Sequence, residues 1–280
     1  MTTPPGSTAE SRLPITEPQN ADPNKPPPPP SPWSTRALAR DIDPRFSDLP
    51  LFACSFTSGL CDSVTVNACS TFVSMQTGNT IFLSLGVSSQ PSNEPSLWLR
   101  SLVSLASFSF GCLCFSNTRR LGPRRKGVLA ASFLLQAVLI VIAAALAESG
   151  VVGEFDSPDA ARRSEGHKVL AAIALLAWQF GGQISSSRML GFGEVPTCVL
   201  TSVYCDLFSD PKLLAPLREN PKRNRRIGAV LSLLIGGIAS GWIQRAERGM
   251  IIVLWIAAGI KFVLAFAWVF WKAKGVEEDE

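Results

Sequence analysis

Residues Gly249–Trp271 read GMIIVLWIAAGIKFVLAFAWVFW, and Lys261 is the one charged side chain among these 23 positions. A helix of about 20 apolar residues is long enough to cross the hydrocarbon core of a bilayer. Working outward from this stretch, we find five more apolar runs of similar length, at Leu51–Phe72, Leu97–Ser116, Gly127–Ala147, Lys168–Ser187 and Ile227–Gln244. The pattern predicts an all-α polytopic membrane protein with six transmembrane helices.

The composition excludes several other classes of protein. The 280 residues are 46% hydrophobic and 17% charged, whereas soluble proteins carry about 25% charged residues. The seven cysteines are too sparse for a secreted disulfide scaffold, and most of them lie inside apolar runs. The net charge of +4 comes from short basic loops and not from one continuous basic face, which argues against a nucleic-acid partner. We therefore expect a lipid bilayer as the surroundings, in the plasma membrane or an internal membrane.

The two ends of the chain differ in composition from the apolar part. Residues 1–47 are polar and rich in proline, so we expect a disordered cytoplasmic tail, with a short amphipathic helix near Arg36 and Arg40. The transmembrane domain is expected over residues 48–272, and residues 273–280 form a short acidic C-terminal tail. The proline run Pro26–Pro30 is read as part of a solvated tail, and the alternative is a docking site for a proline-reading domain at Pro26–Pro32.

Two further apolar runs, Thr77–Val87 and Val195–Phe208, are too short to cross the bilayer comfortably. If neither run crosses, six spans place every basic cluster on the cytoplasmic side, as the positive-inside rule requires. The two runs are then broken or re-entrant segments, and residues 88–96, 148–167 and 245–248 are external. Three spans with one short segment occur twice with opposite orientation, which predicts a 3+3 inverted repeat typical of secondary transporters. The basic clusters are Arg36, Arg40 and Arg45, the loops Arg119–Lys126 and Lys212–Arg226, and the terminal Lys272 and Lys274.

The first half contains an unusual polar stretch around Asp62, which lies in the middle of its span. An ionised group at that depth costs a few kcal/mol and usually faces a cavity or a partner. The Met75–Thr80 turn follows, where a glycine lets the backbone leave helical geometry and polar side chains can meet freed amides or a ligand. One interpretation is a site for a polar substrate or an ion, and the other is that these groups only cap a broken helix. The residues concerned are Asp62, Gln76, Thr77, Gly78, Asn79 and Thr80.

The second half offers a looser counterpart. Gln183 follows a Gly-Gly pair, and a proline favours a helix break just before Thr197 and Thr201. Lys261 lies near the centre of its span, about 15 Å from either end, where its side chain reaches the interface only with difficulty. We predict an ion pair between Lys261 and Asp62. The alternative is that the span is shifted and Lys261 reaches the membrane surface.

Motifs for hydrolysis or nucleotide binding are missing from the sequence, since it contains no H-E-x-x-H, G-x-S-x-G or P-loop. We therefore expect no catalytic residues, no cofactor and no enzyme activity. No C-x-x-C occurs, so we expect no metal site and read the cysteines as small buried apolar residues, although a path for a soft metal ion is the alternative.

The combination of Gly59-x-x-Asp62, the Met75–Thr80 turn, Gly181-Gly182-Gln183 and the break at Pro196–Ser202 resembles the YoaK-like family of integral membrane proteins. The resemblance covers roughly residues 48–270, and the proline-rich head makes the chain similar to a fungal-type member. Pro196–Ser202 has fewer threonines than the family pattern. The resemblance implies a multi-span helical protein from a domain family of unknown function, and it supplies no substrate.

We therefore expect a secondary transporter or permease for a small polar solute or anion. No ATP-binding motif occurs, so a gradient would drive it, with Asp62 as the protonatable group for a proton gradient. The alternative is a membrane scaffold without transport, whose proline-rich tail recruits a cytosolic partner. A homo-oligomer is compatible with either function.

Overall fold

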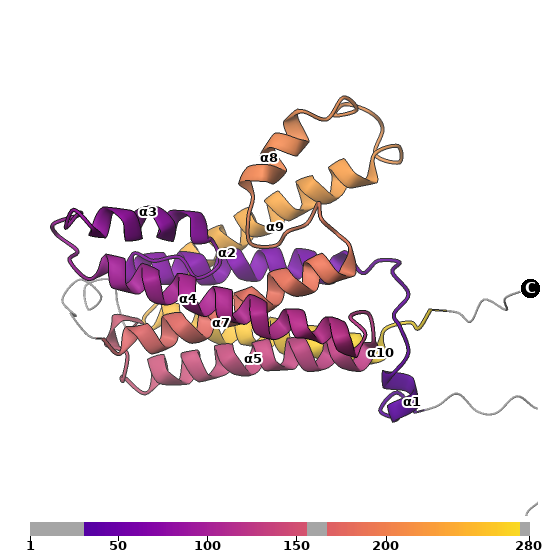
Figure 1. Ribbon diagram of the computed structural model, residues 1–280, viewed down its shortest axis with the longest axis horizontal. Coiled ribbons are helices and arrows are strands. Elements are labelled where there is room, and N and C mark those ends of the chain that lie inside the picture. The colour runs from indigo at the N-terminus through magenta and orange to yellow at the C-terminus, as the bar shows by residue number, and fades with distance from the viewer. Residues whose placement is uncertain (1–30, 156–166, 275–280) are drawn as a thin grey trace, which may run out of the picture.

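The structure, a computed structural model, describes residues 31–155 and 167–274 (Figure 1). All regular structure in these residues is helical. They contain no strand, and their only β pairing is two isolated bridges. The all-α prediction is therefore confirmed. The helices are α1 (Thr35–Leu38), α2 (Leu49–Cys69), α3 (Gln76–Gly86), α4 (Leu97–Ser116), α5 (Lys126–Glu148), α7 (Val169–Leu190), α8 (Thr201–Phe208), α9 (Pro221–Ile243) and α10 (Gly249–Phe270), with 3₁₀ turns at Asn117–Leu121 and Gly153–Phe155.

Six of these helices, α2, α4, α5, α7, α9 and α10, are long and apolar enough to cross a membrane, as the sequence predicts. Most of their boundaries differ from the prediction, by one to six residues, and two of the differences have a clear local cause. Helix α2 ends at Cys69 because Ser70 adopts a left-handed conformation with φ of 53°. Helix α9 begins earlier, at Pro221, because the Asn220 side chain accepts a hydrogen bond from the Arg223 amide and proline suits the first turn.

The helix pairs follow a repeated plan. Helix α2 packs on α9 as α4 packs on α7, and α10 contacts α2 as α5 contacts α7. Helix α3 lies on α4 as α8 lies on α9, and α5 packs on α10. In Figure 1, α3 runs alongside the bundle near one of its ends, whereas α8 and the first half of α9 project away from the bundle.

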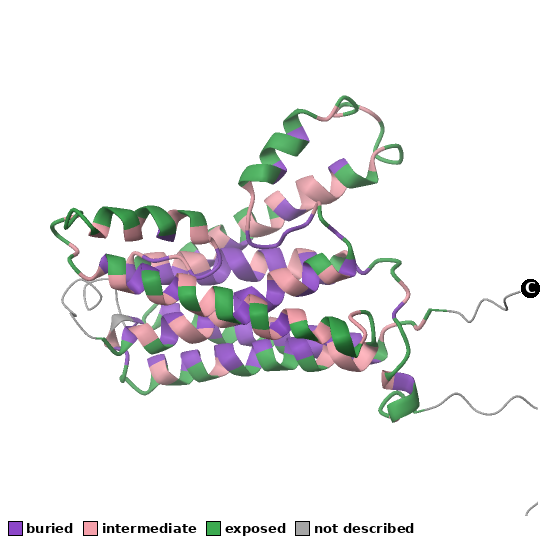
Figure 2. Cartoon of the chain, viewed as in Figure 1, coloured by how far each residue is buried: buried purple, intermediate pink, exposed green. Residues whose placement is uncertain are grey.

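Burial separates inner helices from outer ones. In the most apolar window of each helix, 61% of the residues are buried in α2 and α7 and 50% in α5 and α10, against 28% in α4 and 17% in α9. Figure 2 shows the buried residues concentrated where the inner helices face one another. Helices α2, α5, α7 and α10 therefore form the centre, and α4 and α9 flank it with apolar surface suited to lipid.

Glycines bring the flanking helices into backbone contact with the centre. A Cβ on Gly59 of α2 would lie 2.1 Å from the Leu233 carbonyl oxygen of α9, and one on Gly236 would lie 2.2 Å from the Phe56 oxygen. The α4–α7 pair repeats the arrangement, because a Cβ on Gly181 would lie 2.3 Å from the Phe108 oxygen. Such close approach is possible only without a side chain, as in small-residue interfaces of membrane helices.

Residues 31–47, which the sequence assigned to a disordered tail, instead pack against the bundle. We call residues 31–48 the N-terminal strap. Ile42 is 2% exposed, and its amide donates to the Arg124 carbonyl oxygen at 2.9 Å, while the Lys274 amide donates to Asp41 at 2.9 Å. Trp33 makes edge contacts with two phenylalanine rings of α10. Trp33 and Ile42 are apolar residues within a basic and polar stretch of the sequence. They make these contacts, which the average composition of the stretch does not reveal.

The segments that carry the basic clusters meet at one end of the bundle (Figure 1). The strap bonds to the loop before α5 and to the chain end after α10, and Arg225 of α9 binds Asp48 at the start of α2. This grouping matches the arrangement on which the predicted topology depends. The proline run, the acidic residues 156–166 of the predicted external loop and the C-terminal residues 275–280 lie outside the described residues.

Candidate functional site

The break after α2 is held by Asp62. This carboxylate accepts hydrogen bonds from the backbone amides of Val73 (2.9 Å) and Ser74 (2.8 Å) and from the Ser74 hydroxyl (2.6 Å). Asp62 lies seven residues before the end of α2 at Cys69, or about 10 Å along the helix axis. The chain therefore turns back beside α2 before α3 begins, and the carboxylate meets amides that have no helical partner.

The polar turn that follows fastens the linker to α4. Asn79 accepts from the Phe72 amide (3.1 Å) and donates to the Phe72 oxygen (2.7 Å), while the Ser104 hydroxyl of α4 also donates to that oxygen. Gln76 donates to the Val73 oxygen and to Ser104. Gly78 faces the Phe72 ring, which a Cβ would approach to 2.9 Å. These contacts give Gln76, Gly78 and Asn79 the capping geometry that the sequence left as an alternative to ligand binding.

The four predicted threonines do not share one environment. Thr77 and Thr80 are exposed on α3, and Thr201 is exposed at the start of α8. Thr197 is buried, with φ of 62°, in the linker between α7 and α8. The structure therefore brings only Thr197 of the four near the buried centre.

The break after α7 also returns to the middle of its helix. Gln183 lies seven residues before the end of α7 at Leu190, and its amide nitrogen lies 3.5 Å from the Cys198 sulfur in the linker. The Ser187 hydroxyl donates to the Val195 oxygen at 2.6 Å. The linker from Val195 to Cys198 is buried throughout, so irregular backbone here is enclosed by protein, as membrane depth requires.

Lys261 lies at the centre of the molecule with no exposed surface. Its Nζ donates to the side-chain oxygens of Gln136 on α5 (2.7 Å) and Gln183 on α7 (2.6 Å), and lies 3.7 Å from the Cys54 sulfur on α2. The Phe133 ring is 5.2 Å from the ammonium. One buried cation therefore joins all four inner helices through neutral groups. We call Lys261, Gln136 and Gln183, together with Gln179 one helical turn before Gln183, the central cluster.

Gln136 and Gln179, which the sequence analysis did not single out, complete this cluster. Both are fully buried. The Gln136 amide nitrogen and both polar atoms of the Gln179 side chain have no hydrogen-bond partner. Gln179 precedes Gln183 by four residues on α7, so the two lie on one helix face. A long amide side chain inside an apolar span is the signal that could have identified them.

The predicted ion pair between Asp62 and Lys261 is wrong. The ion pairs in the described part of the chain all involve Arg225 or Arg226, and none joins Lys261 or Asp62 to a partner within 4.0 Å. Asp62 turns toward its own linker, whereas Lys261 faces two glutamines. Backbone amides that follow the helix break satisfy the carboxylate, so it needs no distant cation. The alternative, that Lys261 reaches the surface, is also wrong because the side chain is fully buried.

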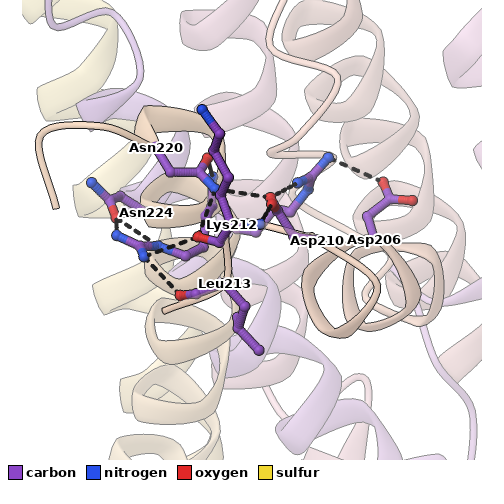
Figure 3. Close-up of polar contacts among 8 residues, drawn as sticks. Asp206, Asp210, Lys212, Leu213, Asn220 and Asn224 are labelled. Carbon is purple, nitrogen blue, oxygen red and sulfur yellow. Dashed lines mark hydrogen bonds and ion pairs between the residues drawn. The ribbon is translucent and has the colours of Figure 1, made fainter. Parts of the chain in front are cut away.

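A second polar network organises the loop between α8 and α9 (Figure 3). The Arg223 side chain is 3% exposed and donates to several loop carbonyl oxygens, including those of Leu213 (2.7 Å) and Ala215. Asp210 accepts from the Asn220 side chain and the Lys212 amide, and these hydrogen bonds lower the pKa of Asp210 below its usual value. Buried donors matched to carbonyl oxygens give this projecting loop a defined shape.

Arg225 connects this end of the bundle to the α7–α8 linker. Its guanidinium binds Asp48 and Glu194, each at 2.9 Å, and stacks 4.7 Å above the Phe192 ring. The three partners come from the start of α2 and from the linker, which are far apart in sequence. Arg225 therefore clamps the entrance of the linker to α2 and α9.

A polar cavity of about 830 Å³ opens at the opposite end, between the end of α2 and the start of α4. Asn67, Glu94 and Arg100 contribute to its lining. Arg100 is 8% exposed and donates to the Cys69 carbonyl oxygen at 3.3 Å, while the Ser70 hydroxyl donates to Glu94. The cavity thus carries both signs of charge at the end where α2 stops.

Among the described residues, no group of three or more His, Cys, Asp or Glu side chains is arranged to hold a metal ion. Comparison with known proteins places the chain in a family context. A family model described as "Protein of unknown function (DUF1275)" matches residues 50–267. No curated protein matched the chain, and no solved structure matched it.

Proposed function

Because the chain belongs to the DUF1275 family of unknown function, we propose its function from the site: a secondary permease for a small polar solute or anion. Six helices of membrane-spanning length make it a multi-pass membrane protein. The proposal also places it among the YoaK-like, fungal-type members, on the strength of the Gly59-x-x-Asp62 and Met75–Thr80 motifs and the proline-rich head. A carrier, and not an enzyme, is proposed, with energy taken from a gradient.

The helix pairing supports an inverted repeat of residues 51–147 and 168–271. The contacts α2–α9, α2–α10 and α3–α4 have counterparts in α4–α7, α5–α7 and α8–α9 when α7, α8, α9 and α10 take the places of α2, α3, α4 and α5. The glycine contacts repeat in the same way, with Gly59 and Gly236 in one pair and Gly181 and Gly111 in the other. Secondary transporters use such repeats to expose one site alternately to the two sides.

The two linkers support re-entrant segments. Asp62 and Gln183 each contact their linker seven residues before their helix ends. In an antiparallel pair such as α2 and α7, these two levels lie on opposite sides of the middle of the membrane. Broken helices that meet near the midplane are where transporters of this architecture bind solute and coupling ions.

The observation that carries the proposal is Lys261, a fully buried cation at the junction of both halves. An ionisable group at membrane depth is costly, and its usual reason is a substrate or ion path. Four inner helices meet there through two neutral amides and a thiol, which can exchange partners without breaking a strong ion pair. A scaffold has no comparable need for a charge at this point.

Native cysteines provide a test that does not require the substrate. Cys54 and Cys198 are buried beside the central cluster, and Cys205 is exposed on α8. In proteoliposomes, a permease should expose the central thiols to a small impermeant methanethiosulfonate reagent, at a rate that changes with imposed ion and proton gradients. Modification is mapped by mass spectrometry, with Cys205 as the reactive control. Full reaction of Cys205 while Cys54 and Cys198 stay unmodified under every gradient would favour a scaffold.

A further inference from the structure

The charge around Lys261 is not balanced by the groups that surround it. Its polar neighbours are the oxygens of Gln136 and Gln183 and the sulfur of Cys54. Other groups near it are the Cys61 and Cys198 thiols, and the nearest inner-helix carboxylate, Asp62, is bonded to Val73 and Ser74. No carboxylate oxygen in the described residues lies within 4.0 Å of its Nζ. A buried cation without an anion favours an external counter-charge.

The neutral groups of the cluster also carry hydrogen-bond donors. The Lys261 ammonium orients both bonded amides, because it donates to their oxygens and so directs each amide nitrogen away. The Gln183 nitrogen then donates to Ser58 at 2.9 Å and to the Cys54 carbonyl oxygen at 3.2 Å. The Gln136 nitrogen has no acceptor although it is fully buried. An unpartnered donor on an amide that is already bonded to a buried cation needs an acceptor.

Gln179 adds a further unsatisfied amide. It lies one turn from Gln183 on the same face of α7, and neither its nitrogen nor its oxygen has a partner. A buried amide without hydrogen bonds destabilises a folded protein, so Gln136 on α5 and Gln179 on α7 each need a reason. A ligand that accepts hydrogen bonds supplies one.

We propose that the central cluster binds a small monovalent anion, held by the Lys261 ammonium and by the amide N–H groups of Gln136 and Gln179. The assignment rests on the proposed permease function and names its substrate class. One fixed cation neutralises one negative charge, which favours a monovalent ion over a divalent one. The close-packed centre favours an ion of the size of chloride, nitrate or formate, which exchanges places with the glutamine oxygens on the ammonium.

The test measures binding to the full-length protein purified in detergent. Thermal unfolding is followed in sodium chloride, nitrate or formate, with sodium gluconate at equal ionic strength as the reference. At least one of the small anions should raise the melting temperature by about 5 °C at saturation. Lys261→Met should abolish this rise, and Lys261→Arg should keep part of it.

Two further variants keep the test decisive if Lys261→Met fails to fold. Gln136→Leu and Gln179→Leu should each weaken anion binding about tenfold, which is the loss expected for one hydrogen bond to a charged group. Ser101→Ala is the matched control, because Ser101 is also buried with an unpartnered hydroxyl but lies on α4. Equal melting temperatures in gluconate and in all three small anions would overturn the proposal, as would an anion effect that survives in Lys261→Met.

The outcome is distinguishable from that of the permease proposal. Anion binding with Cys54 and Cys198 still protected in vesicles would keep this site and remove the transport function. Gradient-dependent exposure of those thiols without any anion effect would keep the permease and remove the anion as its substrate.

Discussion

Substitution of Gly236 by alanine tests whether backbone contact between α2 and α9 holds the bundle together. A Cβ at this position would lie 2.2 Å from the Phe56 carbonyl oxygen, whereas ordinary contacts begin at 3.4 Å. The helices would have to separate by about 1.2 Å, a distance set by these two values. Overpacking of this kind costs about 1–3 kcal/mol.

Gly241, five residues later on α9, is the matched control. Nothing lies within 4 Å of the Cβ that alanine would add there. Alanine is the better helix former by about 1 kcal/mol, so Gly241→Ala should leave the protein equally stable or more stable. Gly236→Ala has the same propensity gain but must also separate the helices, so the two variants should differ by about 1–3 kcal/mol.

The assay is thermal unfolding in detergent, reported by a thiol-reactive dye that reacts as the buried cysteines become accessible. A difference of 1 kcal/mol corresponds to about 2–4 °C in a domain of this size. Gly236→Ala should therefore unfold several degrees below Gly241→Ala. Equal melting temperatures for the two variants would show that the packing of α9 on α2 does not depend on this contact.

Three further predictions concern the breaks and the strap. Asp62→Ala should lower the free energy of unfolding by about 2–6 kcal/mol because it leaves two buried amides unpaired, and Ser74→Ala should lower it by less. A denaturant titration that ranks the two variants in the reverse order would contradict the capping role of Asp62. In a double-mutant cycle, Asp62→Asn and Lys261→Met should add within about 0.5 kcal/mol because they share no hydrogen-bond partner, and a coupling well above this value would restore their direct interaction. Deletion of residues 2–30 should leave the melting temperature nearly unchanged, whereas deletion of 2–43 also removes the buried Ile42 and should lower it, and equal values for both deletions would show that the strap does not stabilise the bundle.

The sequence alone was sufficient for the fold class and the six spans, since a run of about 20 apolar residues has few stable forms other than a membrane helix. It also identified Asp62, Gln183 and Lys261 as unusual, because each is a polar or charged side chain within an apolar run. The ends of the spans were less accurate at Ser70 and Asn220, where a single left-handed residue or a capping side chain decides the boundary.

Only the tertiary structure decided which buried polar side chains contact one another. Asp62 and Lys261 carry opposite charges at similar depth, which made an ion pair the simplest pairing, but the linker after α2 returns amides to the carboxylate. Gln136 gained its importance because α5 places it 2.7 Å from a lysine 125 positions later in the chain. The periodicity of apolar residues and the placement of charges indicate which residues are buried and which surface faces lipid. The contacts between buried polar groups depend on how six similar apolar helices are arranged around one another. That arrangement is set by contacts such as those of Gly59 and Gly181, because the absence of a side chain determines which helices can touch.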